Sequence, residues 1–180
     1  MRFGEVEARG IALTPQGRDL YEKMVAEVDA RLRAAGKSAT RQVVAAQVWQ
    51  ERLPGTEREL GRQDLAYFAY RMADPSTPLT DPRAREAIER RDLQALIDAG
   101  VVLTDPIVYE DFLPRSAAGI FASNLTSNGS MDAHQGGAER DLGWMSDVIG
   151  RQIAVPEEVY AAESRASVDE TERALGIQLT

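Results

Sequence analysis

Two carboxylates separated by one residue, in Glu5-Val6-Glu7, are the first residues along the chain whose types and spacing can do chemistry. Residues 3–8 alternate with a period of two, which predicts a β-strand. Glu5 and Glu7 then share one face of the strand, where they can hold a cation or act as an acid and a base. An edge strand that carries solvated glutamates fits the same pattern, so the spacing leaves both interpretations open.

A second candidate is the run of small residues Ser116-Ala117-Ala118-Gly119, which follows an extended stretch that begins near Asp105. Small side chains let the backbone approach a ligand closely, and the amides together with the Ser116 hydroxyl can bind a carboxylate or another oxyanion. A tight packing corner would use the same residue types. The pattern alone therefore does not separate the two.

The single histidine, His134, lies within a stretch at 123–137 that is rich in Ser, Asn and Gly. A metal-binding histidine is usually held by a rigid element with supporting hydrogen bonds, so we expect His134 to be exposed and to bind no metal. One histidine also argues against a self-contained His-rich metal site or a catalytic triad. The absence of cysteine excludes disulfides, thiol catalysis and Cys-ligated metals.

The composition indicates a globular protein of about one domain, with 180 residues of which 43% are hydrophobic. The 21 basic and 29 acidic side chains give a formal charge of −8, which argues against nucleic acid as a partner. No apolar run approaches the roughly 20 residues of a membrane helix. The N-terminus lacks the apolar stretch of a secretory signal, so we expect a cytoplasmic protein without a membrane partner.

Helices and strands must position these candidates, and the chain offers clear start signals for both. Thr14-Pro15 predicts a helix that ends near Gly36, because Thr is a favoured cap and Pro suits the first turn. Residues 65–70 are apolar on both faces and fit either a buried strand or a helix. The other predictions are a helix at 41–50, a helix from Asp81-Pro82 to Gly100, extended segments at 101–103 and 107–113 around an Asp105-Pro106 turn, and helical structure from Leu142 with a break at Pro156.

The stretch from Gly10 to Arg18 suggests a non-enzyme alternative. A strand that runs through Leu13-Thr14-Pro15 into a helix resembles the wing-to-helix junction of winged-helix regulators. Such a regulator needs a helix-turn-helix before the wing, whereas only nine residues precede Gly10.

Three segments occur together in a fixed order along the chain: Arg2 through Pro15, Leu65-Ala66-Tyr67-Phe68, and Asp105 through Leu125. Together they resemble the 2-oxoadipate dioxygenase/decarboxylase family, also described as hydroxyglutarate synthase. The resemblance extends over nearly the whole chain, but it covers only the C-terminal portion of a family member.

The resemblance implies a mononuclear non-haem Fe(II) enzyme with an α+β fold. It also implies the C-terminal part of a vicinal-oxygen-chelate-like fold, with mixed strands and flanking helices. The implied reaction uses O₂ to decarboxylate and hydroxylate 2-oxoadipate, giving D-2-hydroxyglutarate and CO₂ in bacterial lysine catabolism. A face of two histidines and one carboxylate leaves positions on the iron open for the 2-oxo acid and O₂.

By the same resemblance, Glu7 is expected to be the carboxylate ligand, with Glu5 as the runner-up. Arg115 and Ser116 are expected to lie against the distal carboxylate of the substrate, through the backbone and the serine hydroxyl. Position 115 departs from the apolar residue that the family pattern implies. His134 lies at neither histidine motif of the family.

The family's two histidine ligands and a substrate-binding arginine belong to an N-terminal region that this chain does not contain. We therefore expect residues 1–180 to form a single partial domain, with a flexible loop at about 123–143, that is inactive by itself. The missing N-terminal half is expected to supply the two histidines and the arginine. A non-catalytic binding or interaction fragment is the alternative function.

Overall fold

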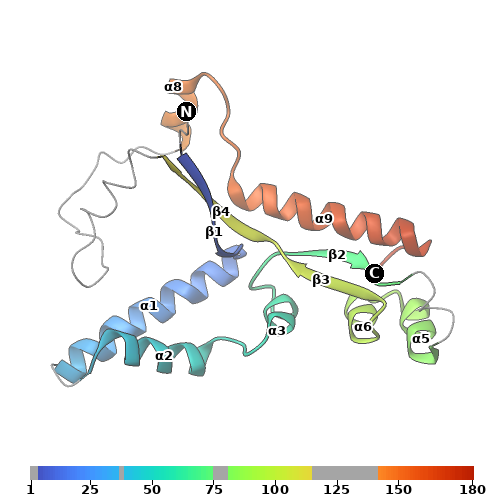
Figure 1. Cartoon of the computed structure of the whole chain (residues 1–180), viewed down its shortest axis with the longest axis horizontal. Helices are drawn as coiled ribbons and strands as arrows, with labels where there is room; N and C mark the ends of the chain where they lie inside the picture. The colour runs from blue at the N-terminus through green and yellow to red at the C-terminus, as the bar shows by residue number, and fades with distance from the viewer. Residues whose placement is uncertain (1–3, 37–38, 75–80, 115–141) are drawn as a thin grey trace. The chain divides into compact units, whose positions relative to one another are not determined.

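The computed structural model describes residues 4–36, 39–74, 81–114 and 142–180, without the side chains of 4–9, 110–114, 142 and 145. Within these ranges the chain forms helices and two small sheets (Figure 1). In chain order the elements are β1 (Gly4–Ile11), α1 (Pro15–Ala35), α2 (Arg41–Arg52), α3 (Glu57–Arg62), β2 (Phe68–Met72), α5 (Pro82–Arg90), α6 (Leu93–Asp98), β3 (Val102–Pro106), β4 (Val108–Pro114), α8 (Leu142–Ile149) and α9 (Pro156–Leu175).

The chain divides into two compact units. One holds β1, β4 and α8, and the other holds the remaining described elements, including α9 beyond its first residue. The chain passes from one unit to the other after Gly10, after Ile107 and after Pro156. The predicted α+β class is confirmed by this mixture of helices and strands. The single partial domain and the vicinal-oxygen-chelate-like fold stay predictions.

The segment at 65–70, which the pattern left open, is extended from Phe68 onward. It forms β2, which pairs antiparallel with β3 so that Phe68 lies opposite Pro106 and Met72 opposite Val102. The apolar character of this segment on both faces is that of a buried strand, and Phe68 is 3% exposed.

The predicted turn at Asp105-Pro106 is wrong, because both residues belong to β3. The N–H of Ile107 donates to the carbonyl of Tyr67 at 3.0 Å. Hydrogen-bonded and non-hydrogen-bonded pairs alternate in an antiparallel ladder, so the next pair, Phe68 with Pro106, needs no N–H from the proline. A strand therefore accommodates Pro106 without losing a hydrogen bond.

The helix predicted from Asp81-Pro82 to Gly100 is two helices, α5 and α6. Arg91 adopts a left-handed conformation with φ 54°, which ends α5. The Asp92 carboxylate then accepts from the N–H groups of Gln94 at 2.8 Å and Ala95 at 3.3 Å. Aspartate is favoured at an N-cap, where its carboxylate accepts from the free N–H groups of the first turn, and is unfavourable in a helix interior. The chain therefore begins a new helix at Asp92.

One hydrophobic core lies where α5 and α6 pack against β3. The chain after α9 joins this core, because Ile177 and Leu179 pack against it. The N–H of Thr180 also donates to the carbonyl of Arg91 at 3.0 Å. Helix α9 lies alongside β2 (Figure 1), where the N–H of Tyr70 donates to Oγ of Ser167 at 2.9 Å. The buried core residues are Ala84, Ala87, Leu96, Ile97, Val101 and Val102.

A second core joins α1 and α2, which follow one another in the chain and pack side by side (Figure 1). The two helices were predicted from sequence, and each buries one face here, since Met24 and Val28 of α1 and Val44 and Val48 of α2 are buried. The spacing of four residues on each helix places these side chains on one face. Trp49 packs against this core, and its ring meets that of the exposed Tyr21 edge to face with centroids 5.9 Å apart.

Helices α8 and α9 match the prediction of a helical C-terminal part interrupted near Pro156, which begins α9. Between them, the N–H of Ile153 donates to Oγ of Ser146 at 3.1 Å. None of the described helices is both long enough and apolar enough to cross a bilayer.

Candidate functional site

The strand that carries Glu5 and Glu7 is β1, and it pairs with β4 in a two-stranded sheet. The pairing is informative because β4 ends at Pro114, immediately before Arg115 and Ser116. Two segments about a hundred residues apart in sequence are therefore neighbours in one sheet. The side chains of Glu5 and Glu7, and all of Arg115 and Ser116, lie outside what the structure describes.

A junction of backbone hydrogen bonds forms where β1 ends and β4 begins. The N–H of Ala12 donates to the carbonyl of Ile107 at 2.8 Å, and that of Tyr67 donates to Ala12 at 2.8 Å. The N–H of Ile107 donates to Tyr67 at 3.0 Å, which closes the triangle. Ala12 and Ile107 are buried, so these peptide groups have little access to water. All three segments on which the family resemblance rests thus meet at one junction.

The start of α1 is fastened to the chain just before β2 through Thr14. Its hydroxyl donates to the carbonyl of Asp64 at 2.5 Å and accepts from the N–H of Gly17 at 3.1 Å. The N–H of Thr14 donates to the carbonyl of Leu65 at 3.2 Å. The Thr-Pro-x-Gly pattern, which suggested a wing-to-helix junction, therefore has a structural role in this fold.

Metal-ligating groups do not gather within the described residues. No three or more His, Cys, Asp or Glu side chains among them lie close enough to hold a metal ion. His134 lies outside the described ranges, so its expected exposure stays a prediction.

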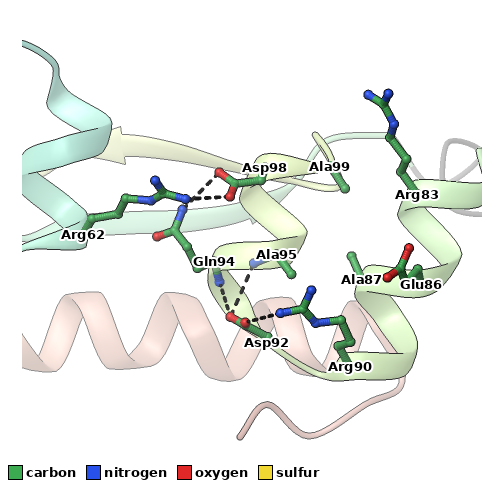
Figure 2. A pocket seen from close by; sticks show the side chains of 10 residues that line it. All are labelled: Arg62, Arg83, Glu86, Ala87, Arg90, Asp92, Gln94, Ala95, Asp98 and Ala99. Carbon is green, nitrogen blue, oxygen red and sulfur yellow. Dashed lines mark hydrogen bonds and ion pairs between the residues drawn. The ribbon is translucent and has the colours of Figure 1, made fainter.

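An ionic pocket of about 370 Å³ lies between α5 and α6 (Figure 2). Its floor includes alanines from both helices, and α3 contributes one side chain. Its rim mixes both signs of charge, so it offers polar and ionic contacts to a ligand. The charged and amide side chains that line it are Arg62, Arg83, Glu86, Arg90, Asp92, Gln94 and Asp98.

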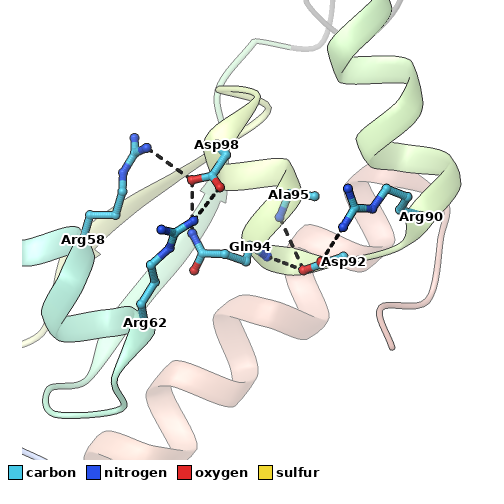
Figure 3. Close-up of polar contacts among 7 residues, drawn as sticks. All are labelled: Arg58, Arg62, Arg90, Asp92, Gln94, Ala95 and Asp98. Atoms are coloured by element: carbon cyan, nitrogen blue, oxygen red, sulfur yellow. Dashed lines mark hydrogen bonds and ion pairs between the residues drawn. The ribbon is translucent and has the colours of Figure 1, made fainter.

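Asp98, the last residue of α6, joins this helix to α3 (Figure 3). It accepts from Arg58 at 3.2 Å and from Arg62 at 2.7 Å, both on α3, and from Gln94 at 3.3 Å. These residues were missed from sequence, because α3 itself was not predicted and 36 residues separate Arg62 from Asp98. The Thr56 cap and the acidic first turn of α3 were the local signal that was available.

By its fold and by the placement of its acidic strand, the chain is an α+β protein whose candidate site lies on the β1–β4 sheet. A family model for 2-oxoadipate dioxygenase/decarboxylase matches residues 1–124. The chain belongs to this family.

Curated relatives support the assignment. The chain is 38% identical over 162 residues to a 2-oxoadipate dioxygenase/decarboxylase of Mycobacterium tuberculosis, covering 90% of this chain and 28% of the relative. It is 36% identical over 178 residues to the Pseudomonas putida protein of that name, covering 98% of this chain and 37% of the relative. The chain therefore spans about a third of the length of these relatives.

A solved structure agrees with this assignment. The hydroxyglutarate synthase of Pseudomonas putida, crystallised in complex with 2-oxoadipate, matches with a TM-score of 0.58 and 31% identity. The match covers 93% of this chain and 34% of that one. The family assignment takes the place of the winged-helix alternative.

Proposed function

We propose that this chain is the C-terminal portion of a non-haem Fe(II)-dependent 2-oxoadipate dioxygenase/decarboxylase. The reaction converts 2-oxoadipate and O₂ to D-2-hydroxyglutarate and CO₂, and we assign it to lysine catabolism in the cytoplasm. The main support is the pairing of β1 with β4, because it brings the strand of Glu7 beside the strand that leads into Arg115 and Ser116. Family membership supplies the substrate class.

In this proposal Glu7 is the carboxylate ligand and Glu5, on the same strand face, is the alternative. The backbone at Arg115 and the hydroxyl of Ser116 bind the distal carboxylate of the 2-oxo acid. A hydroxyl and backbone amides are suitable donors, because hydrogen bonds to an ionised acceptor are short and strong.

The residues of this chain do not by themselves fit Fe(II). The whole sequence contains one histidine, so it cannot supply two histidines and a carboxylate from ligand motifs of its own. We propose that a segment corresponding to the N-terminal part of the longer relatives supplies both histidines and a substrate-binding arginine. The isolated chain is then inactive, because a lone carboxylate binds Fe(II) weakly.

The test joins this chain to the N-terminal two thirds of the Pseudomonas putida relative, either as a fusion or by co-expression. Oxygen uptake that depends on 2-oxoadipate, with release of CO₂, is expected from the combined protein and not from this chain alone. A folded, iron-loaded combination that consumes no oxygen with 2-oxoadipate would contradict the substrate assignment.

The ligand assignment is tested in the same combined protein. Glu7→Gln keeps the size of the side chain and removes its charge, so it is expected to lower bound iron and turnover by at least about tenfold. Glu5→Gln is the matched control and should retain both. The reverse result would make Glu5 the ligand.

The second candidate, a non-catalytic interaction fragment, is favoured by the exposed apolar side chains of α8. Val148 is 64% exposed and Ile149 is 57% exposed. Trp144, one helical turn before Val148, is also exposed. This function would be favoured if the chain binds the N-terminal part of the relative stably and the combined protein contains iron, yet shows no turnover with any 2-oxo acid.

A further inference from the structure

A second pocket lies among α3, α6 and the β2–β3 sheet. It has a volume of about 270 Å³, just below the roughly 300–1,000 Å³ that is usual for pockets that hold drug-sized molecules, so it suits a smaller ligand. Its lining includes Glu57, Arg62, Phe68, Tyr70 and Ile97. We call it the Tyr70 pocket.

The inner wall of the Tyr70 pocket is apolar and aromatic. Phe68 and Ile97 are buried, and Leu93 and the half-buried Tyr70 also line the pocket. Gly61 lies close against one side of the Phe68 ring, because a Cβ there would lie 3.3 Å from two ring carbons. Such a wall suits an apolar ligand group of roughly the size of an aromatic ring.

Tyr70 adds a hydroxyl to this wall. Burial, and to a smaller extent the charge of Asp64, raise the pKa of Tyr70 above its ordinary value of 10.0. The phenol therefore keeps its proton at neutral pH and adds no third negative charge to the pocket.

The rim carries both signs of charge. Arg58 and Arg62 line the pocket and share the single carboxylate of Asp98, so this group has a net charge of +1 (Figure 3). Each guanidinium has five N–H donors, and each of these contacts uses one of them, which leaves donors for a ligand carboxylate. The Arg58 side chain is 56% exposed and that of Arg62 is 42% exposed, so a ligand can reach both.

Two carboxylates complete the rim. Asp92 is engaged as the cap of α6 and in a 3.5 Å contact with Arg90. Glu57, beside Arg58 on α3, is exposed and lines the pocket. A ligand with a carboxylate alone would meet Glu57 as a like charge, and an amine alone would meet the two arginines. A zwitterion satisfies both.

We propose that the Tyr70 pocket binds a free apolar α-amino acid, with its side chain on Phe68, Tyr70 and Ile97. Its carboxylate contacts Arg58 and Arg62, and its ammonium contacts Glu57. This site does not depend on the proposed reaction, since it uses neither iron nor a 2-oxo acid.

Three ligands of similar shape test the charge requirement on the whole chain: L-phenylalanine, 3-phenylpropionate and phenethylamine. Titration is followed by calorimetry and by amide NMR shifts at Gly61 and Thr104, which both line the pocket. We expect phenylalanine to bind with a Kd on the order of 1 mM, and each singly charged analogue to bind at least about tenfold more weakly. An analogue that binds as tightly as phenylalanine, or the absence of any saturable shift, overturns the proposal.

Matched variants locate the site. Arg62→Gln and Glu57→Gln are each expected to weaken phenylalanine binding by about tenfold, since each removes one charge-assisted contact. Arg83→Gln and Glu86→Gln are the controls, because they make the same charge changes in the ionic pocket of Figure 2. Neither Arg83 nor Glu86 lines the Tyr70 pocket. Both control variants should bind phenylalanine as the unchanged chain does. Equal affinity in all four variants would contradict the assignment.

Discussion

Gly17 and Leu65 approach so closely that no other residue type fits at position 17. A Cβ on Gly17 would lie 1.8 Å from the carbonyl oxygen of Leu65, far inside van der Waals contact. The same carbonyl accepts from the N–H of Thr14 at 3.2 Å, so it cannot move away without losing that bond. The first turn of α1 therefore packs directly on the backbone at Leu65, just before β2. This contact lies close in sequence to the junction of Ala12, Tyr67 and Ile107.

Gly17→Ala is expected to destabilise the chain by at least about 1–3 kcal/mol, the typical cost of overpacking. The neighbouring group is backbone, which cannot rotate aside as a side chain would. Chemical denaturation monitored by circular dichroism measures the change. Gly55→Ala is the matched control, because a Cβ at Gly55 meets nothing within 4 Å. Equal denaturation midpoints for the two variants would contradict the close approach.

Thr14→Val is expected to cost about 1–2 kcal/mol, because it removes the cap of α1 and leaves the Asp64 carbonyl without its donor. Thr14 is 3% exposed, so water cannot readily replace either hydrogen bond. Thr14→Ser keeps the hydroxyl and should recover most of the loss. Thermal unfolding of the two variants side by side measures the difference, and a Ser variant as unstable as the Val variant would rule out this role for the hydroxyl.

Arg91→Gly is expected to stabilise the chain by about 0.5–1 kcal/mol, since glycine adopts the left-handed conformation without strain. The effect is informative because glycine normally destabilises a helix. Glu89→Gly, two residues earlier within α5, should lower stability by up to about 1 kcal/mol. Opposite signs in urea denaturation would support the helix break at Arg91, and a loss of stability in both variants would indicate one continuous helix.

Low pH is expected to weaken the α1–α2 pair through its ion pairs. Hydrogen bonds from Arg31 lower the pKa of Glu51, and those from Arg31 and Arg52 lower the pKa of Glu27, both below 4.5. A carboxylate whose folded pKa is depressed stabilises the fold above its unfolded pKa, and this contribution disappears as the pH falls through the folded value. Stability should therefore fall as the pH is lowered below the ordinary glutamate pKa of 4.5.

Arg31→Gln tests whether these ion pairs cause the pH dependence, because it removes the guanidinium that Glu27 and Glu51 share. Its denaturation midpoint should fall less between pH 5 and pH 3 than that of the unchanged chain. Arg33→Gln removes an exposed charge from the same helix and should preserve the full dependence. An unchanged pH dependence in Arg31→Gln would show that other carboxylates are responsible.

Local signals were enough to predict several elements from sequence. Thr14-Pro15 and Asp81-Pro82 each begin a helix as predicted, and their side chains accept from the N–H groups of Gly17 and Arg83. Capping and the spacing of apolar residues act within one or two turns, so the sequence contains all the information they need. The same holds for the alternation that predicts β1.

Where two local signals favoured different secondary structures, the sequence alone could not show which one forms. The apolar spacing at 88–97 continues a helix, whereas Asp92 favours a new start, and the structure follows Asp92. Asp105-Pro106 has the composition of a turn but lies in β3, because the register places Pro106 where no N–H is required. Pairing partners decide such cases, and they come from distant parts of the chain.

By itself the sequence determined the family, the candidate residues Glu7, Arg115 and Ser116, and the starts of the main helices. Only the tertiary structure decided that β1 pairs with β4 and that Gly17 contacts Leu65. It alone also brought Arg58 and Arg62 to Asp98. The reason is physical: propensity, capping and periodicity depend on neighbours in sequence, whereas strand pairing, close packing and ion pairs depend on which distant segments meet.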